Sequence, residues 1–235
     1  MTIPWLTERD PFPPVHTALR DPDGLLAAGG DLSAERLLDA YARGIFPWFG
    51  DDDPVLWWSP DPRMVLWLHE VHVSRSLRRA IRSARYAVTL DIVFPRVIAA
   101  CAEPRDAEGG TWITAGMIGA YTRLAALGHA HSVEVWSDGE LAGGLYGVAL
   151  GRMFYGESMF SRRRDASKVA LVYLARQLER WGFELIDCQM STAHLASLGA
   201  REIPRAEFLR HVQRLVRLPG ASLPWVLEAD PMGAV

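Results

Sequence analysis

Two predicted strands end in side chains that could transfer a proton or bind a cation. Asp187 and Gln189 lie near the end of the predicted strand 184–188, and strand alternation places both on one face. Glu157 directly follows the predicted strand 152–156. Acids in such positions often line clefts, whereas a buried acid needs a partner. The sequence therefore allows each acid a catalytic role and, equally, a structural one as an ion-pair partner or helix cap.

Four arginines form a basic stripe on a predicted helix over residues 74–84. Arg75, Arg78, Arg79 and Arg82 are spaced at i, i+3, i+4 and i+7, which places them on one helix face. Guanidinium groups bind phosphate oxygens bidentately, so this face could bind a nucleic-acid backbone in a salt-dependent way. An ordinary solvated face is the alternative.

Nine tryptophans are present, and Trp48, Trp57, Trp58 and Trp112 lie near Pro or Gly in loop-like sequence. An exposed aromatic ring can stack on a nucleotide base for about 1–3 kcal/mol. Single exposed aromatic residues are also common without any such function. Together with the arginine stripe, these residues are compatible with a site for a single-stranded nucleotide end.

Several common catalytic and binding motifs are absent from the sequence. Ser158 lacks the closing glycine of a hydrolase nucleophile elbow, and no Gly-rich loop with a lysine for nucleoside triphosphates occurs. The two cysteines, Cys101 and Cys188, are far apart, and His129 and His131 have no third ligand at metal spacing. We therefore expect no disulfide, no metal and no cofactor.

The composition is that of a globular protein, with 235 residues, 49% hydrophobic residues, 23% charged residues and a formal net charge of −3. These values exclude a mostly disordered chain, a coiled-coil rod and a globally basic nucleic-acid binder. No apolar run of about 18 residues occurs, so we expect no membrane span. The N-terminus also lacks a basic segment before an apolar run, so we expect a cytoplasmic protein.

The order of predicted elements indicates an α+β fold. From residue 131 onward the pattern predicts three strands, a helix over residues 167–181 and a further strand, which together favour a mixed β-sheet with flanking helices. Residues 106–110 are the best candidate boundary. We therefore predict a small N-terminal lobe over residues 1–108, with the basic helix and aromatic loops, and a second domain over residues 109–235.

Several segments together resemble leucyl/phenylalanyl-tRNA–protein transferases. They occur in the family's order over about residues 20–210: 24–32 (GLLAAGGDL), 43–49 (RGIFPWF), 57–63 (WWSPDPR), 111–114 (TWIT), 128–134 (GHAHSVE), 143–147 (GGLYG), 156–161 (GESMFS) and 185–189 (LIDCQ). The basic stripe is all arginine where the family also admits lysine.

The resemblance implies an acetyltransferase-like (GNAT-type) fold for the second domain. It also implies transfer of Leu or Phe, with Met as a further candidate, from aminoacyl-tRNA to the α-amine of proteins that begin with Arg or Lys. The product would carry an N-degron and be degraded.

The resemblance also implies roles for individual residues. We assign Asp187 to orient and deprotonate the incoming amine, directly or through a relay with Gln189, and Glu157 to bind the acceptor's cationic side chain or amine. An apolar pocket for Leu or Phe is implied for Leu145, Phe154, Met159, Leu174 and Ile186. Trp48 and Trp112 would flank the terminal adenosine, and Arg75, Arg79 and Arg82 would hold acceptor-stem phosphates.

Strand alternation places Phe154 and Ile186 opposite Glu157 and Asp187, so this site requires a bulged or splayed strand end. Two other functions also remain open. A coenzyme A-dependent N-acyltransferase would share the order of elements, although residues 161–166 lack a Gly-rich turn for pyrophosphate. A non-catalytic tRNA-binding module would need only the basic stripe.

Overall fold

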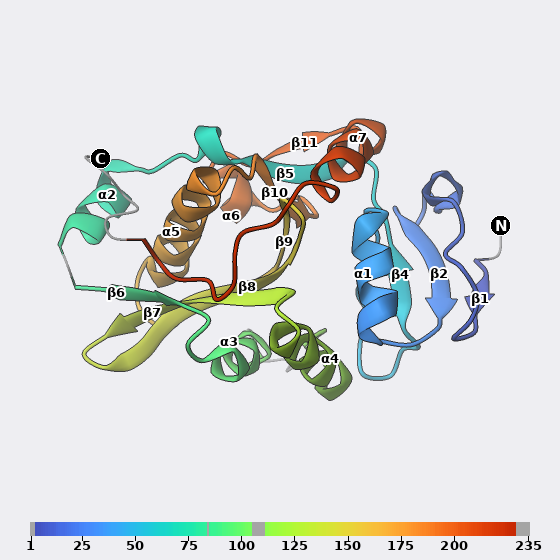
Figure 1. Cartoon of the computed structure of the whole chain (residues 1–235), viewed down its shortest axis with the longest axis horizontal. Helices are drawn as coiled ribbons and strands as arrows, with labels where there is room; N and C mark the ends of the chain where they lie inside the picture. Colours follow the sequence, from blue (N-terminus) through green and yellow to red (C-terminus); the bar gives the residue numbers. More distant parts are fainter. Residues whose placement is uncertain (1–2, 84, 105–110, 229–235) are drawn as a thin grey trace.

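The computed structural model describes residues 3–83, 85–104 and 111–228 and contains two β-sheets. The smaller sheet has the strand order β1-β2-β4-β3. Its strands are β1 (Trp5–Leu6), β2 (Leu25–Gly29), β3 (Phe46–Pro47) and β4 (Leu56–Trp58). This sheet and α1 (Ala34–Ala42) form the N-terminal lobe, at the right of Figure 1.

The larger sheet has seven strands in the order β11-β5-β10-β9-β8-β7-β6. They are β5 (Arg63–Trp67), β6 (Ala87–Leu90), β7 (Ala130–Ser137), β8 (Glu140–Leu150), β9 (Met153–Ser161), β10 (Leu185–Gln189) and β11 (Arg201–Ile203). The pair β9–β10 is parallel, whereas the other neighbouring pairs are antiparallel. The sheet is therefore mixed, as predicted.

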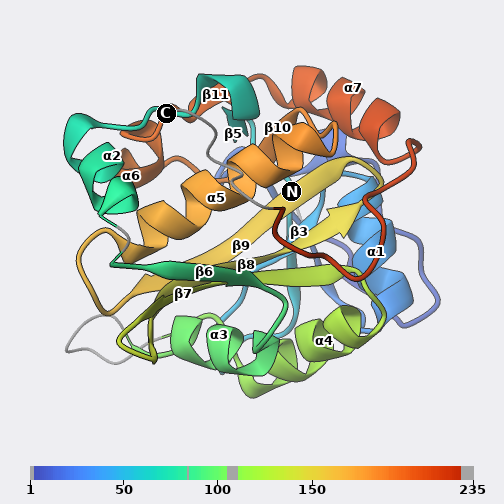
Figure 2. The ribbon, with the colours of Figure 1, turned by 60° about the vertical axis from the view of Figure 1, so that its left-hand side comes forward.

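Helices cover both faces of the larger sheet (Figure 2). α3 (Phe94–Cys101) and α4 (Ala115–Ala126) lie on one face, and α5 (Ala166–Arg180) lies on the other. The remaining helical segments are α2 (Arg75–Arg82), α6 (Ala193–Ala196), α7 (Arg205–Leu215) and the short 3₁₀ helices at Val15–Thr17 and Leu68–Glu70. α2 packs against α5, and α1 packs against α4 and β8.

Local sequence signals account for several of these boundaries. Ser33, Ser74 and Thr114 each accept a backbone N–H with the side-chain oxygen, which caps α1, α2 and α4. Asp138 and Gly139 both have positive φ, which allows the tight turn between β7 and β8. The helix predicted over residues 74–84 is therefore present as α2, and the turn joins two of the strands predicted from residue 131 onward.

The α+β fold with a small N-terminal lobe is confirmed, but the division between the sheets does not lie at residue 108. β5 and β6 both pair within the larger sheet, although they precede residue 108 in the sequence. The predicted boundary residues 106–110 themselves lie outside the described residues. The change of sheet occurs instead between Trp58 and Arg63, because residues 59–62 connect β4 to β5.

The aromatic segments of the N-terminal lobe are more regular than the sequence predicts. Trp57 and Trp58 lie in β4, where both are buried, and the Trp57 indole donates to the backbone oxygen of Gly29 over 2.8 Å. The loop interpretation is therefore wrong for these two residues, because β4 pairs with β2 and β3 on its two sides.

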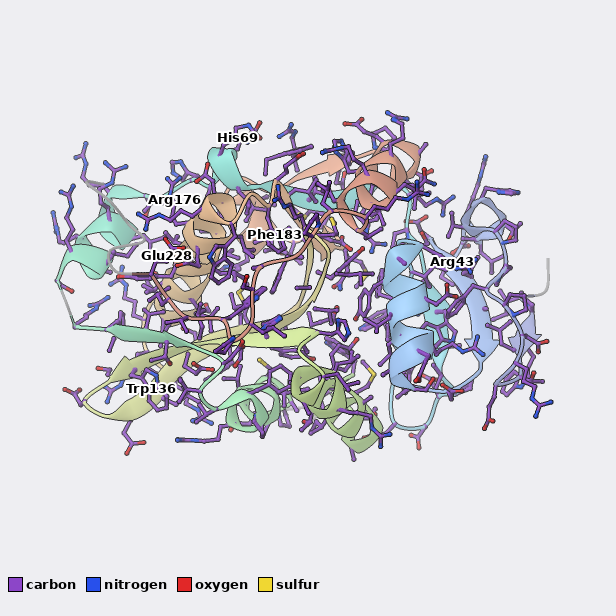
Figure 3. All side chains as sticks on the ribbon, in the orientation of Figure 1. Arg43, His69, Trp136, Arg176, Phe183 and Glu228 are labelled. Carbon is purple, nitrogen blue, oxygen red and sulfur yellow. The ribbon has the colours of Figure 1, made fainter. Side chains whose placement is uncertain are left out.

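The segment after α7 runs back along α5 (Figures 1 and 2). Its Trp225 is buried and stacks on His131 with ring centroids 3.5 Å apart. Glu228, labelled beside α5 in Figure 3, accepts from the side chains of Gln177 and Trp181, each over 3.0 Å. These contacts attach the segment to β7 of the larger sheet and to α5. No helix in the described ranges is long and apolar enough to cross a bilayer.

Candidate active site

A cavity opens where the two parallel strands of the larger sheet separate. The pairing of β9 with β10 ends at Tyr155 and Asp187, and residues beyond that point on both strands line the cavity. α5, α6 and the N-terminal lobe supply further walls. The cavity has a volume of about 340 Å³. The cavity is therefore lined by residues from several elements that meet where the two strands diverge.

Two bulges explain how polar and apolar side chains reach the same cavity. Tyr146 is paired with Ser158 and Gly147 with Gly156, which leaves Glu157 as an extra residue in β9. In β10 the register shifts between Asp187 and Gln189. Each bulge interrupts the two-residue alternation of its strand. The bulged strand ends that the predicted site requires are therefore present.

The apolar part of the cavity contains every residue predicted for the amino-acid pocket. Leu145, Phe154, Met159, Leu174 and Ile186 all line the cavity. They come from β8, β9, α5 and β10. Their shared location creates a surface that can enclose a branched or aromatic hydrocarbon side chain, because burying apolar area is favourable.

Trp48 and Trp112 line the same cavity. Trp48 is 37% exposed and packs edge-to-face on Trp58, with centroids 5.4 Å apart. The Trp58 indole also donates to the backbone oxygen of Trp48 over 2.7 Å. Trp48 is therefore held in place while part of its ring stays open for stacking.

Glu157 is bound by three neutral donors. Tyr41 and Gln189 donate to Oε1 over 2.8 and 2.9 Å, and Tyr121 donates to Oε2 over 3.1 Å. The hydroxyls of Tyr41 and Tyr121 also contact each other. Burial raises the pKa of Glu157 to about 7, and the nearby charge of Asp187 adds to the effect, while the three hydrogen bonds oppose it. Glu157 can therefore take up or release a proton near neutral pH.

Asp187, by contrast, is fully buried in an ion pair. Arg63 donates from Nε to Oδ1 over 2.8 Å and from Nη2 to Oδ2 over 2.6 Å. The guanidinium lies between the rings of Phe46 and Phe208, 4.7 and 4.6 Å from their centroids. The pair thus joins β5 and β10 to the N-terminal lobe and α7, and Asp187 does not itself line the cavity.

Gln189 connects Asp187 to the cavity. Its backbone N–H donates to Asp187 Oδ1 over 2.9 Å, and its side chain donates to Glu157. Gln189 has a φ of 61°, in the left-handed region that non-glycine residues rarely adopt. The hydrogen bond that the Gln189 backbone N–H donates to Asp187 supports this backbone, so Asp187 positions Gln189.

Direct proton removal by Asp187 is not supported by this geometry, because its carboxylate is enclosed and engaged by Arg63. The other predicted route, in which Asp187 acts through Gln189, is compatible with the contacts of Gln189 to Asp187 and Glu157. Arg63, Tyr41 and Tyr121 are not among the site residues predicted from the sequence. Tyr41 and Tyr121 are fully buried, and buried tyrosine hydroxyls usually find a hydrogen-bond partner. The one sequence signal for Tyr41 was its hydroxyl among the apolar residues of the predicted helix, since such a hydroxyl needs a buried partner.

The arginine stripe lies outside the cavity, on α2. Arg75, Arg78, Arg79 and Arg82 are exposed, while Leu77 and Ala80 of the same helix are buried. Within the described part of the chain, no salt bridge involves these four arginines. α2 packs on α5, which supplies Leu171 and Leu174 to the cavity. The stripe therefore offers positive charge on an element adjacent to a cavity wall.

Other reactive groups add no further centre to the site. Among the residues described, no group of three or more His, Cys, Asp or Glu could hold a metal ion. Cys188 lines the cavity, but burial raises the pKa of its thiol, so the neutral form is favoured.

Comparison with known proteins identifies the family. A model of the leucyl/phenylalanyl-tRNA protein transferase matches residues 65–213, and a model of its N-terminal domain matches residues 30–61. A leucyl/phenylalanyl-tRNA–protein transferase of Nitrosospira multiformis is 61% identical over 228 residues, covering 97% of this chain and 98% of that protein. One of Thiobacillus denitrificans is 63% identical over 218 residues, covering 93% and 96%.

Solved structures show more distant similarity. A GCN5-related N-acetyltransferase from Kribbella flavida matches with a TM-score of 0.36 and 13% identity, over 69% of this chain and 57% of that chain. This value is too low to support a conclusion. The sequence relatives cover nearly the full chain at about 60% identity. The chain therefore belongs to the leucyl/phenylalanyl-tRNA–protein transferase family, as its sequence motifs predict, and is an enzyme.

Proposed function

We propose that this enzyme transfers Leu or Phe, with Met as a further candidate, from aminoacyl-tRNA to the α-amine of proteins that begin with Arg or Lys. The new N-terminal residue would mark the acceptor as an N-degron for proteolysis. The observation that carries this proposal is the cavity itself, which joins an apolar pocket to the Glu157–Gln189 pair. An activated amino acid and an attacking amine could meet there.

The aminoacyl end of the tRNA occupies the apolar side of the cavity. Leu145, Phe154, Met159, Leu174 and Ile186 enclose the amino-acid side chain. Trp48 and Trp112 flank the terminal adenosine, whose base can stack on an exposed indole. Both contacts hold the ester carbonyl close to the polar side of the cavity. Positioning of this kind supplies much of the rate enhancement when the ester is already activated.

Glu157 binds the acceptor's α-ammonium group and accepts one of its protons. The freed nitrogen attacks the ester carbonyl carbon, and the bond from that carbon to the ribose oxygen then breaks. The leaving oxygen takes the second proton released by nitrogen and becomes a hydroxyl of the tRNA. An amine with a pKa of about 8 needs only a weak base near neutral pH. A carboxylate with a pKa of about 7 meets that requirement.

Asp187 acts through Gln189 as a positioning residue. It accepts the Gln189 backbone N–H, and the Gln189 side chain donates to Glu157 Oε1. The amide therefore fixes one oxygen of the carboxylate that receives the proton. Arg63 holds the Asp187 carboxylate in place, because the pair is bidentate and buried.

The test is transfer of labelled Leu from Leu-tRNA to a peptide that begins with Arg. We expect labelled peptide with the intact tRNA and none after the charged tRNA is treated with ribonuclease. Replacing the tRNA with acetyl-CoA should give no acylated peptide. Acylation from acetyl-CoA alone would instead establish the coenzyme A-dependent alternative. Binding of tRNA without transfer would establish the non-catalytic one.

Neutralising the stripe tests the tRNA side of the proposal. We expect the triple variant Arg75→Gln, Arg79→Gln, Arg82→Gln to weaken tRNA binding and to reduce its log–log salt slope by about 2–3, since each phosphate contact contributes roughly 1. Binding can be measured by filter retention between low and moderate salt. The matched control neutralises Arg9, Arg20 and Arg217, which are also exposed. Equal slopes for the two triple variants would exclude the stripe as the phosphate site.

A further inference from the structure

The proposed reaction leaves the acceptor's basic side chain without an assigned partner. Both oxygens of Glu157 are already engaged by Tyr41, Tyr121 and Gln189. A carboxylate with three donors around it leaves room for a small α-ammonium group, but not also for the long side chain of Arg or Lys. Selection of Arg or Lys therefore requires carboxylates elsewhere, within reach of the same cavity.

A second cavity adjoins the active-site cavity. It has a volume of about 510 Å³ and shares Trp48 and Trp112 with the active-site cavity. Phe49 and Trp58 add aromatic surface, and Asp53 and Glu103 supply the acidic groups. We call it the acidic–aromatic cavity. Aromatic faces beside carboxylates are a suitable environment for a cationic side chain, because both attract positive charge.

The two acids differ in how far they are already used. Asp53 Oδ2 accepts the backbone N–H of Gly50 over 3.1 Å, and no salt bridge within the described ranges involves Asp53. Glu103 pairs with Arg162, but both side chains are about half exposed. An exposed pair of this kind contributes only about 0–1 kcal/mol. Glu103 can therefore accept a second cation or exchange its partner.

Arg162 shows that a guanidinium can bind beside Glu103, one of the two acids that line the cavity. It pairs with Glu103, and its guanidinium carbon lies 5.4 Å from the ring centroid of Phe160. The chain thus already holds one arginine between a carboxylate and an aromatic ring at this edge. The basic helix α2 instead packs on α5, which contributes to a different wall of the active site. The phosphate-binding and cation-binding surfaces would therefore not compete.

Building on the proposed function, we infer that the acidic–aromatic cavity binds the cationic side chain of the acceptor's first residue. Asp53 and Glu103 receive the charge, and the shared tryptophans form the partition between this side chain and the aminoacyl end. The acceptor's α-nitrogen then lies on the active-site side of that partition. Selection for Arg or Lys follows from this cavity, while peptide-bond formation depends on Glu157.

The test compares two acceptor peptides that differ only at the first residue, Arg in one and citrulline in the other. Citrulline has nearly the shape of arginine but no charge. For Asp53→Asn and Glu103→Gln, we expect the ratio of kcat/KM for Arg over citrulline to fall about threefold to tenfold each. Transfer to the citrulline peptide should change little. Since the ratio is measured on one preparation, any loss of folded enzyme cancels.

Asp51→Asn and Asp52→Asn are the matched controls, because both acids are exposed neighbours that do not line the cavity. They should leave the ratio unchanged. An unchanged ratio in Asp53→Asn and Glu103→Gln, with transfer intact, would overturn the inference and leave the proposed function standing. Failure of the unmodified enzyme to transfer Leu to either peptide would instead overturn the proposed function.

Discussion

Two buried carboxylates, Asp187 and Glu157, lie in neighbouring strands of the larger sheet, and their surroundings are opposite. Asp187 faces a guanidinium that donates to both of its oxygens. Glu157 faces two tyrosine hydroxyls and an amide, all of them neutral. Arg63 compensates the charge of Asp187, whereas only dipoles compensate that of Glu157. The same side-chain chemistry is therefore used once to stabilise the fold and once to hold an exchangeable proton.

The comparison shows that burial alone does not identify a functional acid. Both carboxylates are largely inaccessible, with exposed fractions of 0% for Asp187 and 9% for Glu157. What separates them is the charge of the partner and contact with a cavity, which Glu157 has and Asp187 lacks. With no charged partner to offset burial, the pKa of Glu157 is about 7, near neutrality, where proton transfer is most efficient.

The largest expected effect is on stability, from loss of the ion pair. We expect Asp187→Ala to lower the free energy of unfolding by about 3–5 kcal/mol, because it leaves Arg63 buried without a counter-charge. Urea denaturation measures this change. Asp39→Ala removes an exposed partner of Arg43 and should cost no more than about 1 kcal/mol. Similar losses in both variants would mean that the buried pair is no more important than a surface one.

The next effect is on catalysis, from loss of the exchangeable proton. Glu157→Gln should lower kcat about 100-fold or more, the typical contribution of a general base, in a single-turnover transfer assay. Its free energy of unfolding near neutral pH should not fall. Retention of full kcat by this variant would remove Glu157 from the proton path.

The pH dependence of stability provides an independent check on the same variant. The pKa of Glu157 is higher in the fold than its usual 4.5, so the native state binds the proton more tightly than the unfolded chain. Stability from this group is therefore lost as the pH rises from about 4.5 to about 7. Glu157→Gln should remove this loss from a series of unfolding curves.

The smallest expected effect concerns the position of the pH profile. The hydrogen bond from Tyr121 lowers the pKa of Glu157, against the larger effect of burial. Tyr121→Phe should thus raise the inflection of the kcat profile above about 7, by roughly half to one unit. Tyr86→Phe is a control, since Tyr86 donates to the backbone of Arg164 instead. A downward or absent shift would contradict the role given to Tyr121.

Regular elements, and the gathering of five apolar residues around one cavity, could be predicted from the sequence. Arginine spacing identifies the exposed face of α2, and a family resemblance names five pocket residues that the fold brings to one cavity. The short strands of the N-terminal lobe could not be predicted in this way. β3 spans only two residues and β4 three, which is too short for a repeating pattern.

Contacts between residues far apart in the sequence could not be predicted either. Arg63 reaches Asp187 across 124 positions, and Tyr41 reaches Glu157 across 116. No local pattern reports such a pair, so the sequence suggested an acid at the strand tip but not the cation that encloses it. Asp187 and Glu157 could not be told apart from the sequence for the same reason, because only their tertiary neighbours distinguish them.

The C-terminal segment has a consequence for the proposed amino-acid pocket. Trp225 contacts Phe154, with centroids 6.2 Å apart, and Phe154 in turn lines the pocket. The pocket is thus supported from outside by a residue near the far end of the chain. Trimming the indole at position 225 would let Phe154 retreat and admit a bulkier building block. Such a variant could be tested for transfer of unnatural amino acids, and it leaves every residue that lines the cavity unchanged.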